Sequence, residues 1–173
     1  MPTSPFAQLI VMGVSGSGKT TLGQGLAAYY GFVFLDADDF HTLDAKAKMA
    51  RGEGLTDADR APWLARLKAA LEQHTAGGEG VVLACSALKA SYRTALSGPQ
   101  TGFIYLDVPQ GVLRTRLEER QGSYAKASLL PSQLAALEKP GPDEAVTVHV
   151  KADEDAGLVL ADALRQLAEK HAR

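Results

Sequence analysis

Short apolar segments alternate with longer segments of helical periodicity along the whole chain. The apolar segments, which each fit a β-strand buried on both faces, are 8–13, 32–36, 80–86, 102–108 and 145–150. The segments with helical periodicity are 19–29, 57–75, 88–96, 110–120 and 155–171. Strands that alternate with helices indicate right-handed βαβ crossovers. The pattern therefore predicts an α/β fold with a five-stranded parallel sheet and helices on both faces.

Two stretches interrupt this alternation. Residues 37–56 and 120–144 are longer than ordinary connections between a strand and a helix, and the second contains three prolines. Long insertions in a compact α/β domain commonly hold or cover a substrate. We predict a substrate-binding insertion at about 37–56 and a mobile lid at about 120–144. Between them, Thr56 followed by Asp59 predicts a capped helix start.

A polar, glycine-rich stretch separates the first strand from the first helix. Gly13, Gly18, Lys19 and Thr20 match the pattern G-x-x-x-x-G-K-[ST] at every fixed position. Glycines let successive backbone N–H groups point at phosphate oxygens, and the helix that follows adds its positive end. Lys19 would reach the β- and γ-phosphates of ATP, and the Thr20 hydroxyl would coordinate Mg²⁺. The predicted nucleotide-binding residues of this loop are Gly13, Val14, Ser15, Gly16, Ser17, Gly18, Lys19, Thr20 and Thr21.

Acidic residues follow the second strand. Asp36 and Asp38 are two residues apart on a segment expected to be extended, so both should point to one side, at the sheet edge where ligands bind. Phosphoryl transfer to a hydroxyl needs a carboxylate that accepts the proton, and Mg²⁺ needs oxygen ligands. We assign Asp38 to the acceptor hydroxyl as a catalytic residue and Asp36 to the metal. The alternative is an acidic loop that caps the next helix.

Composition narrows the function classes. The chain has 173 residues, which suits a single domain, and its net charge of −2 gives no support to a nucleic-acid surface. Its one cysteine, Cys85, lies within a predicted strand and is interpreted as a buried apolar residue, not a nucleophile. No apolar run is long enough to cross a membrane, and the N-terminal segment lacks the features of a secretory signal. These observations predict a cytoplasmic protein without a membrane or nucleic-acid partner.

Several longer motifs resemble one family. In order, they are GVSGSGKTT, FLDADDFH, KMARGEGLTDADRAPWL, CSALKASYR and RLEERQGSY with SLLPSQLAALEKPG. Together they resemble the small P-loop gluconate kinases over about residues 8–150. The resemblance implies a fold like that of nucleoside-monophosphate kinases, with a lid. It also implies transfer of the γ-phosphoryl group of ATP to the 6-hydroxyl of D-gluconate, with Mg²⁺ as cofactor, in a homodimer.

The resemblance also suggests which residues bind the acceptor. Gluconate has a carboxylate and five hydroxyls, so its pocket needs a cation and hydrogen-bonding side chains. Arg60 or Arg93 would bind the carboxylate through two parallel hydrogen bonds. Tyr92 also matches a motif position of the family. The alternatives are a helix salt bridge of Arg60 with Asp57 or Asp59 and a core position for Tyr92. The predicted acceptor-binding residues are Asp38, His41, Arg60, Ser86, Lys89 and Arg93.

Two arginines lie on the predicted helix that leads into the lid. Arg116 and Arg120 match the family pattern RLxxR, and cations on a closing lid neutralise charge on the transferring phosphoryl group. We predict that Arg116 binds the nucleotide and that Arg120 is catalytic. The alternative is a solvated helix face shared with Glu118 and Glu119.

The chain departs from the family at four positions. Thr42, Ala45, Gly54 and Ser123 stand where the family usually has Pro, Asn, Pro and His. These changes leave the residues of the kinase chemistry intact. They make a related polyol or sugar acid an alternative to gluconate as the acceptor. The competing hypotheses are a shikimate-type kinase of the same fold and a non-catalytic ATP-binding switch.

Overall fold

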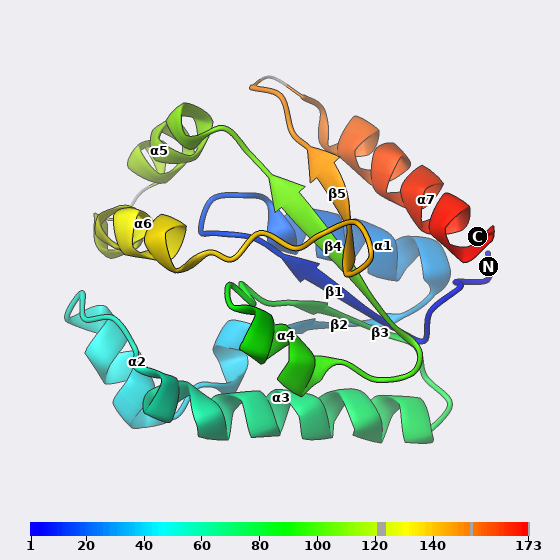
Figure 1. The fold of residues 1–173 in the computed structure, drawn as a ribbon, viewed down its shortest axis with the longest axis horizontal. Coiled ribbons are helices and arrows are strands. Elements are labelled where there is room, and N and C mark those ends of the chain that lie inside the picture. The colour runs from blue at the N-terminus through cyan, green and yellow to red at the C-terminus, as the bar shows by residue number, and fades with distance from the viewer. Residues whose placement is uncertain (121–123, 153, 173) are drawn as a thin grey trace.

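The computed structural model describes residues 1–120, 124–152 and 154–172. Its centre is a five-stranded parallel sheet with the strand order β2-β3-β1-β4-β5 (Figure 1). All the predicted strands are confirmed. After β1 the chain forms the edge strand β2, returns to form β3 beside β1, and then continues on the other side of β1 through β4 and β5, so β1 lies in the middle. The strands are β1 (Gln8–Met12), β2 (Val33–Asp36), β3 (Val81–Ala84), β4 (Thr101–Asp107) and β5 (Ala145–His149).

Helices cover both faces of the sheet, so the predicted fold class is confirmed. They are α1 (Lys19–Tyr30), α2 (Leu43–Ala50), α3 (Asp57–Ala76), α4 (Ala90–Leu96), α5 (Gln110–Glu119), α6 (Tyr124–Ala136) and α7 (Ala156–Ala172), with the 3₁₀ helix η1 (Ala37–Phe40). Among the described residues, no helix combines the length and the apolar character that a membrane span requires.

The sheet separates two apolar cores, because alternate strand side chains point to opposite faces. Leu9 and Val11 of β1 pack into a first core with α1, α5, α6 and α7. Ile10 and Met12 of the same strand pack into a second core with α3 and α4. Figure 1 shows the two layers, with α3 and α4 on one side of the sheet and α1 and α7 on the other. Each face of the sheet thus carries its own set of helices.

The predicted insertion at 37–56 contains η1 and α2. The Thr42 hydroxyl accepts a hydrogen bond from the Ala45 N–H at 3.1 Å and caps α2. The next helix, α3, begins with the predicted capping box, in which the side chains of Thr56 and Asp59 each accept the other's backbone N–H. The sequence change to Thr42 therefore supplies a helix cap.

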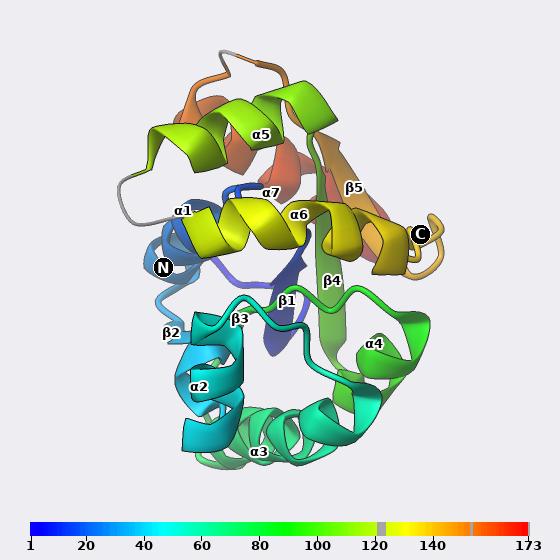
Figure 2. The same cartoon turned by 90° about the vertical axis from the view of Figure 1, so that its left-hand side faces the viewer.

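The predicted lid at 120–144 consists of two different parts. Its first part contains α6, which packs against α5 and places Leu130 in the first core. After α6, Glu138 donates its N–H to the Leu88 carbonyl at 2.8 Å and accepts the Ala90 N–H at 2.7 Å. This second part is therefore fastened to the start of α4. Figure 2 shows α2 and α6 facing each other at the end of the molecule where α5 also lies.

Candidate active site

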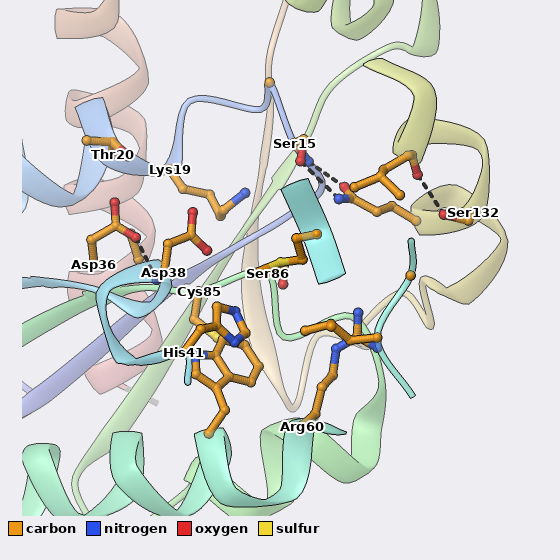
Figure 3. Close-up of a pocket in the computed structure, with 18 of the residues that line it drawn as sticks. Ser15, Lys19, Thr20, Asp36, Asp38, His41, Arg60, Cys85, Ser86 and Ser132 are labelled. Carbon is orange, nitrogen blue, oxygen red and sulfur yellow. Dashed lines mark hydrogen bonds between the residues drawn. The ribbon is translucent and has the colours of Figure 1, made fainter. Parts of the chain in front are cut away.

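A pocket of about 220 Å³ lies where β1, β2 and β3 end, between α3 and α6. It brings together the first helical turn of α1, the acidic residues after β2 and the N-terminal half of α3 (Figure 3). This is the sheet edge at which ligands bind in open α/β folds. The predicted site residues that line it are Ser15, Gly16, Gly18, Lys19, Thr20, Thr21, Asp36, Asp38, His41, Arg60, Ser86 and Arg120.

The glycine-rich loop has the geometry of a phosphate cradle. Gly16 has a φ of +85°, and a Cβ there would lie 3.2 Å from Leu117 Cγ, so only glycine fits without strain. The Lys19 ammonium lies within the loop and donates to the carbonyls of Gly13 and Val14, each at 3.0 Å. Helix α1 has no side-chain cap at its N-terminus, which leaves backbone N–H groups for an anion. Ser17 Oγ is buried without a partner among the described residues.

The acidic pair lies in the pocket, although the predicted local geometry is wrong. Asp36 ends β2, and the chain then turns into η1, so Asp38 is not on an extended segment. Asp36 Oδ1 accepts the Asp38 N–H at 3.0 Å, which is the capping role weighed as the alternative. Both carboxylates nonetheless line the pocket together with Lys19 (Figure 3). Asp36 and Asp38 therefore lie close together because the chain turns into η1, and not because they point to the same side of one strand.

The residues present fit a magnesium site of the kind found in kinases. Thr20 and Asp36 line the same pocket as the phosphate cradle. Within the described parts of the chain, no cluster of three or more His, Cys, Asp or Glu side chains forms a complete metal cage. Mg²⁺ in phosphoryl-transfer sites usually has one or two protein ligands and completes its shell with phosphate and water. One hydroxyl and one carboxylate are therefore an adequate protein contribution.

His41 and Trp63 form one wall of the acceptor side. Their rings stack 4.4 Å apart at an angle of 10°, and Trp63 Nε1 donates to the Ala37 carbonyl at 2.7 Å. His41 is only 8% exposed, and its Nδ1 is buried without a partner in the described structure. Burial lowers the pKa of His41, and the nearby Asp38 partly opposes that effect. The ring is thus a neutral group with an unused hydrogen-bonding atom.

Arg60 reaches the pocket from α3, opposite Lys19 (Figure 3). The predicted alternative was a helix salt bridge, but the two acidic neighbours are engaged elsewhere. Asp57 accepts hydrogen bonds from Lys89 and Tyr92, and Asp59 pairs with Lys48 at 2.8 Å. Arg60 Nη1 instead donates to the Tyr92 hydroxyl at 3.1 Å. The guanidinium therefore lines the pocket, and within the described parts of the chain only one of its N–H groups is bound to another side chain.

The structure does not bring Arg93 or Lys89 to the pocket. Arg93 is 2% exposed, and its guanidinium binds the Glu144 carboxylate and the carbonyls of Ala87, Leu88 and Glu138. These bonds hold the turn after β3, where Ala87 has a φ of +45°. Arg93 therefore supports the fold, and of the two arginines predicted to bind the acceptor carboxylate it is Arg60 that lines the pocket.

The two lid arginines lie close to the phosphate cradle. Arg116 Nη1 donates to the Gly16 carbonyl at 3.1 Å, so Arg116 is not confined to a solvated helix face. It lines a second pocket, between the glycine-rich loop and the segment after β5, which includes Val150 and Val159. Arg120 lines both this pocket and the first one. Arg120 thus lies where the two pockets meet, as do Gly16, Gly18 and Thr21, which also line both.

Gln133 of α6 is a pocket residue that the sequence reasoning missed. Its Oε1 accepts the Ser15 N–H at 2.8 Å, and its Nε2 donates to Ser15 Oγ at 3.0 Å. The dashed lines at Ser15 in Figure 3 mark these contacts. The motif SLLPSQLAALEKPG contained the residue, but nothing in its spacing relates it to a loop 118 positions away.

The remaining predicted positions are placed as follows. Cys85 is fully buried, and burial raises the pKa of its thiol to about 12, which agrees with a residue that is not a nucleophile. Of the four departures, Gly54 lines the pocket, whereas Ala45 is buried in α2 and does not line it. Ser123 lies outside the described residues.

Comparison with known proteins agrees with this geometry. A family model for an AAA domain matches residues 9–140, which include the phosphate cradle and most of the predicted lid. A gluconokinase from Gluconobacter oxydans is 47% identical over 159 residues, which cover 91% of this chain and 89% of that protein.

Solved structures give the same result. A gluconokinase from Sinorhizobium meliloti 1021 is 36% identical, with a TM-score of 0.84 over 99% of this chain and 96% of that one. An unliganded sugar kinase from Janibacter sp. HTCC2649 is 40% identical, with a TM-score of 0.85 over 99% of this chain and 98% of that one. With the phosphate cradle at the edge of a five-stranded parallel sheet, these relatives show that the chain belongs to the gluconokinase family and is an ATP-dependent P-loop kinase.

Proposed function

We propose that the protein transfers the γ-phosphoryl group of ATP to the 6-hydroxyl of D-gluconate. The observation that carries the proposal is the content of one pocket. It joins a phosphate cradle, a carboxylate at Asp38 and a guanidinium at Arg60 on the opposite side. A kinase for a sugar acid needs these three groups, because it must hold a phosphate chain, accept a hydroxyl proton and neutralise a carboxylate.

The nucleotide would occupy the cradle and the second pocket. The backbone N–H groups of the loop and the Lys19 ammonium would bind the β- and γ-phosphates. Lys19 now donates to two loop carbonyls, so phosphate oxygens would draw its ammonium away from them. The second pocket, with apolar Val150 and Val159 beside Arg116, suits the nucleoside end. Mg²⁺ held by Thr20 and Asp36 would neutralise charge on the phosphates.

At the acceptor, Asp38 would accept the proton of the 6-hydroxyl as its oxygen attacks the γ-phosphorus. The new bond joins that oxygen to phosphorus, and the bond from the γ-phosphorus to the β–γ bridging oxygen breaks. ADP leaves, and the product is 6-phosphogluconate. Arg120, which lines both pockets, would stabilise charge on the transferring group.

The other end of the acceptor would face α3. Arg60 has the planar fork of donors that binds a carboxylate through two hydrogen bonds. The Nδ1 of His41, which has no partner among the described residues, and the hydroxyl of Ser86 would bind acceptor hydroxyls. The family resemblance further implies a homodimer in the cytoplasm.

A coupled assay of ADP release tests the proposal with a panel of gluconate, other sugar acids, neutral polyols and shikimate. We expect gluconate to give the highest kcat/KM. Lys19→Ala should abolish turnover, and Asp38→Asn should retain ATP binding while turnover falls by about 10²–10⁴-fold. Preference for shikimate or a neutral polyol would refute the acceptor, and near-wild-type turnover by Lys19→Ala would refute the nucleotide site. ATP hydrolysis that no acceptor stimulates would favour the binding switch.

A further inference from the structure

A chain of hydrogen bonds runs from the surface to the pocket beneath Arg60. The Asp57 carboxylate, at the start of α3, accepts a hydrogen bond from the Tyr92 hydroxyl. It also binds the Lys89 ammonium at 3.0 Å. The Tyr92 hydroxyl in turn accepts from Arg60 Nη1 at 3.1 Å. Asp57 is exposed, Tyr92 is 5% exposed and Arg60 lines the pocket. The chain therefore links solvent to the acceptor side through one buried phenol.

The direction of these bonds follows from the number of protons. A phenol has one hydroxyl proton, so it donates once and otherwise only accepts. An ionised Asp57 can only accept hydrogen bonds, so the Tyr92 hydroxyl donates to Asp57. The lone pairs of the Tyr92 oxygen then remain to accept from Arg60. The hydrogen bond from Tyr92, followed by that from Lys89, keeps the pKa of Asp57 below its ordinary value. Asp57 thus remains an acceptor at neutral pH.

The contact restrains Arg60 without using up its donors. Arg60 Cζ lies 5.4 Å from the centre of the Tyr92 ring, so the phenol contacts the guanidinium through both its face and its hydroxyl. One N–H is directed to Tyr92, and a guanidinium has five. An arginine side chain is flexible, and fixing one edge lowers the entropy lost when the other edge binds a carboxylate. Tyr92 itself is fixed, because it packs in the second core.

We propose that Tyr92 and Asp57 are positioning residues that aim Arg60 at the carboxylate of the acceptor. The inference rests on the proposed function, because it assumes an acceptor with a carboxylate. It explains why a buried tyrosine directs its hydroxyl toward an arginine of the pocket. It also gives Lys89 a role, since its ammonium binds the same carboxylate of Asp57 that Tyr92 binds.

The test measures the KM of Tyr92→Phe for gluconate and for glucitol, the neutral polyol of the same chain length. We expect the KM for gluconate to rise about 3- to 10-fold, the scale of one lost hydrogen bond. The kcat, the KM for ATP and the kcat/KM for glucitol should stay near wild type. Tyr30→Phe is the matched control, because Tyr30 is also buried but lies in the first core. Asp57→Ala, at an exposed position, should give a smaller rise of the same kind and keeps the test valid if Tyr92→Phe folds poorly.

A double-mutant cycle separates positioning from a general loss of structure. If Tyr92 acts through Arg60, Tyr92→Phe should lower kcat/KM for gluconate in the wild-type background and change nothing in an Arg60→Ala background. An equal effect in both backgrounds, or an equal effect on gluconate and glucitol, would overturn the inference. If the wild-type protein does not phosphorylate gluconate, the proposed function fails. If it does and Tyr92→Phe has a wild-type KM for gluconate, only the positioning role fails.

Discussion

Replacement of Arg93 by Met should reduce stability far more than it affects the binding of substrates. The guanidinium of Arg93 is buried and binds the Glu144 carboxylate and three backbone carbonyls. Methionine fills much of the same space but donates no hydrogen bond. The variant therefore leaves the buried Ala87 carbonyl without a donor, while the Leu88 carbonyl keeps the hydrogen bond from the Glu138 N–H.

The magnitude follows from these contacts. The Ala87 carbonyl, left unpaired, costs about 1–3 kcal/mol, and the lost bonds to the Leu88 and Glu138 carbonyls cost about 0.5–1.5 kcal/mol each. Breaking a buried ion pair costs about 3–5 kcal/mol, but the Glu144 side chain is 35% exposed and water can replace part of its interaction. We expect a loss of about 3–5 kcal/mol in the free energy of unfolding. For a domain of this size that corresponds to a fall of about 6–20 °C in melting temperature.

Urea unfolding followed by circular dichroism measures this loss. Glu144→Gln is the control, because its amide oxygen still accepts from Arg93 Nε, and it should cost only about 1 kcal/mol. Kinetics below the transition should show a KM for ATP near wild type in both variants. The reasoning would be refuted if Arg93→Met had wild-type stability and a KM for gluconate raised more than about 12-fold. That result would return Arg93 to the acceptor site.

Two further outcomes are expected. Burial holds the pKa of His41 below its ordinary value of 6.5, so the stability linked to its neutral form is complete above pH 6.5 and is lost as the pH falls toward the lowered pKa. Between about pH 7.5 and pH 5.5 the melting temperature of the wild type should therefore fall more than that of His41→Gln, and parallel curves would contradict this. Gln133→Ala should speed amide exchange in α6, since it removes two hydrogen bonds to Ser15. Unchanged exchange would show that apolar packing, including that of Leu130 and Leu134, holds the helix without these bonds.

The features that the sequence predicted well are local ones. A strand buried on both faces is a continuous apolar run, and the glycine-rich loop has fixed spacing because consecutive N–H groups bind one phosphate chain. The capping box at Thr56 and Asp59 was predicted for the same reason, since its two partners are three residues apart. The helix α6 was missed because it contains Pro131 and lies in a segment with two more prolines.

The roles of Arg93 and Gln133 depend on distant partners, and the sequence alone could not assign them. Arg93 binds Glu144 across 51 positions, and Gln133 binds Ser15 across 118. A buried arginine and a substrate-binding arginine have the same sequence signal, since each occurs in a polar motif that follows a strand. Asp38 lines the pocket as predicted, but the reason given was wrong. The prediction placed it on an extended segment, whereas the turn into η1 brings it to the pocket.

The division of the protein into two cores has a consequence for how its specificity can change. Arg60, Trp63 and Tyr92 of the acceptor side are carried by helices that pack in the second core. The phosphate cradle leads into α1 and contacts α5 and α6, which pack in the first core. The effects of substitutions at residues in contact depend on each other, whereas the effects at distant residues add independently. Substitutions in one core should therefore have little effect on residues that pack in the other core, across the sheet. Substitutions can therefore accumulate on the acceptor side, as at Gly54, which lines the pocket, while the residues that bind ATP stay the same.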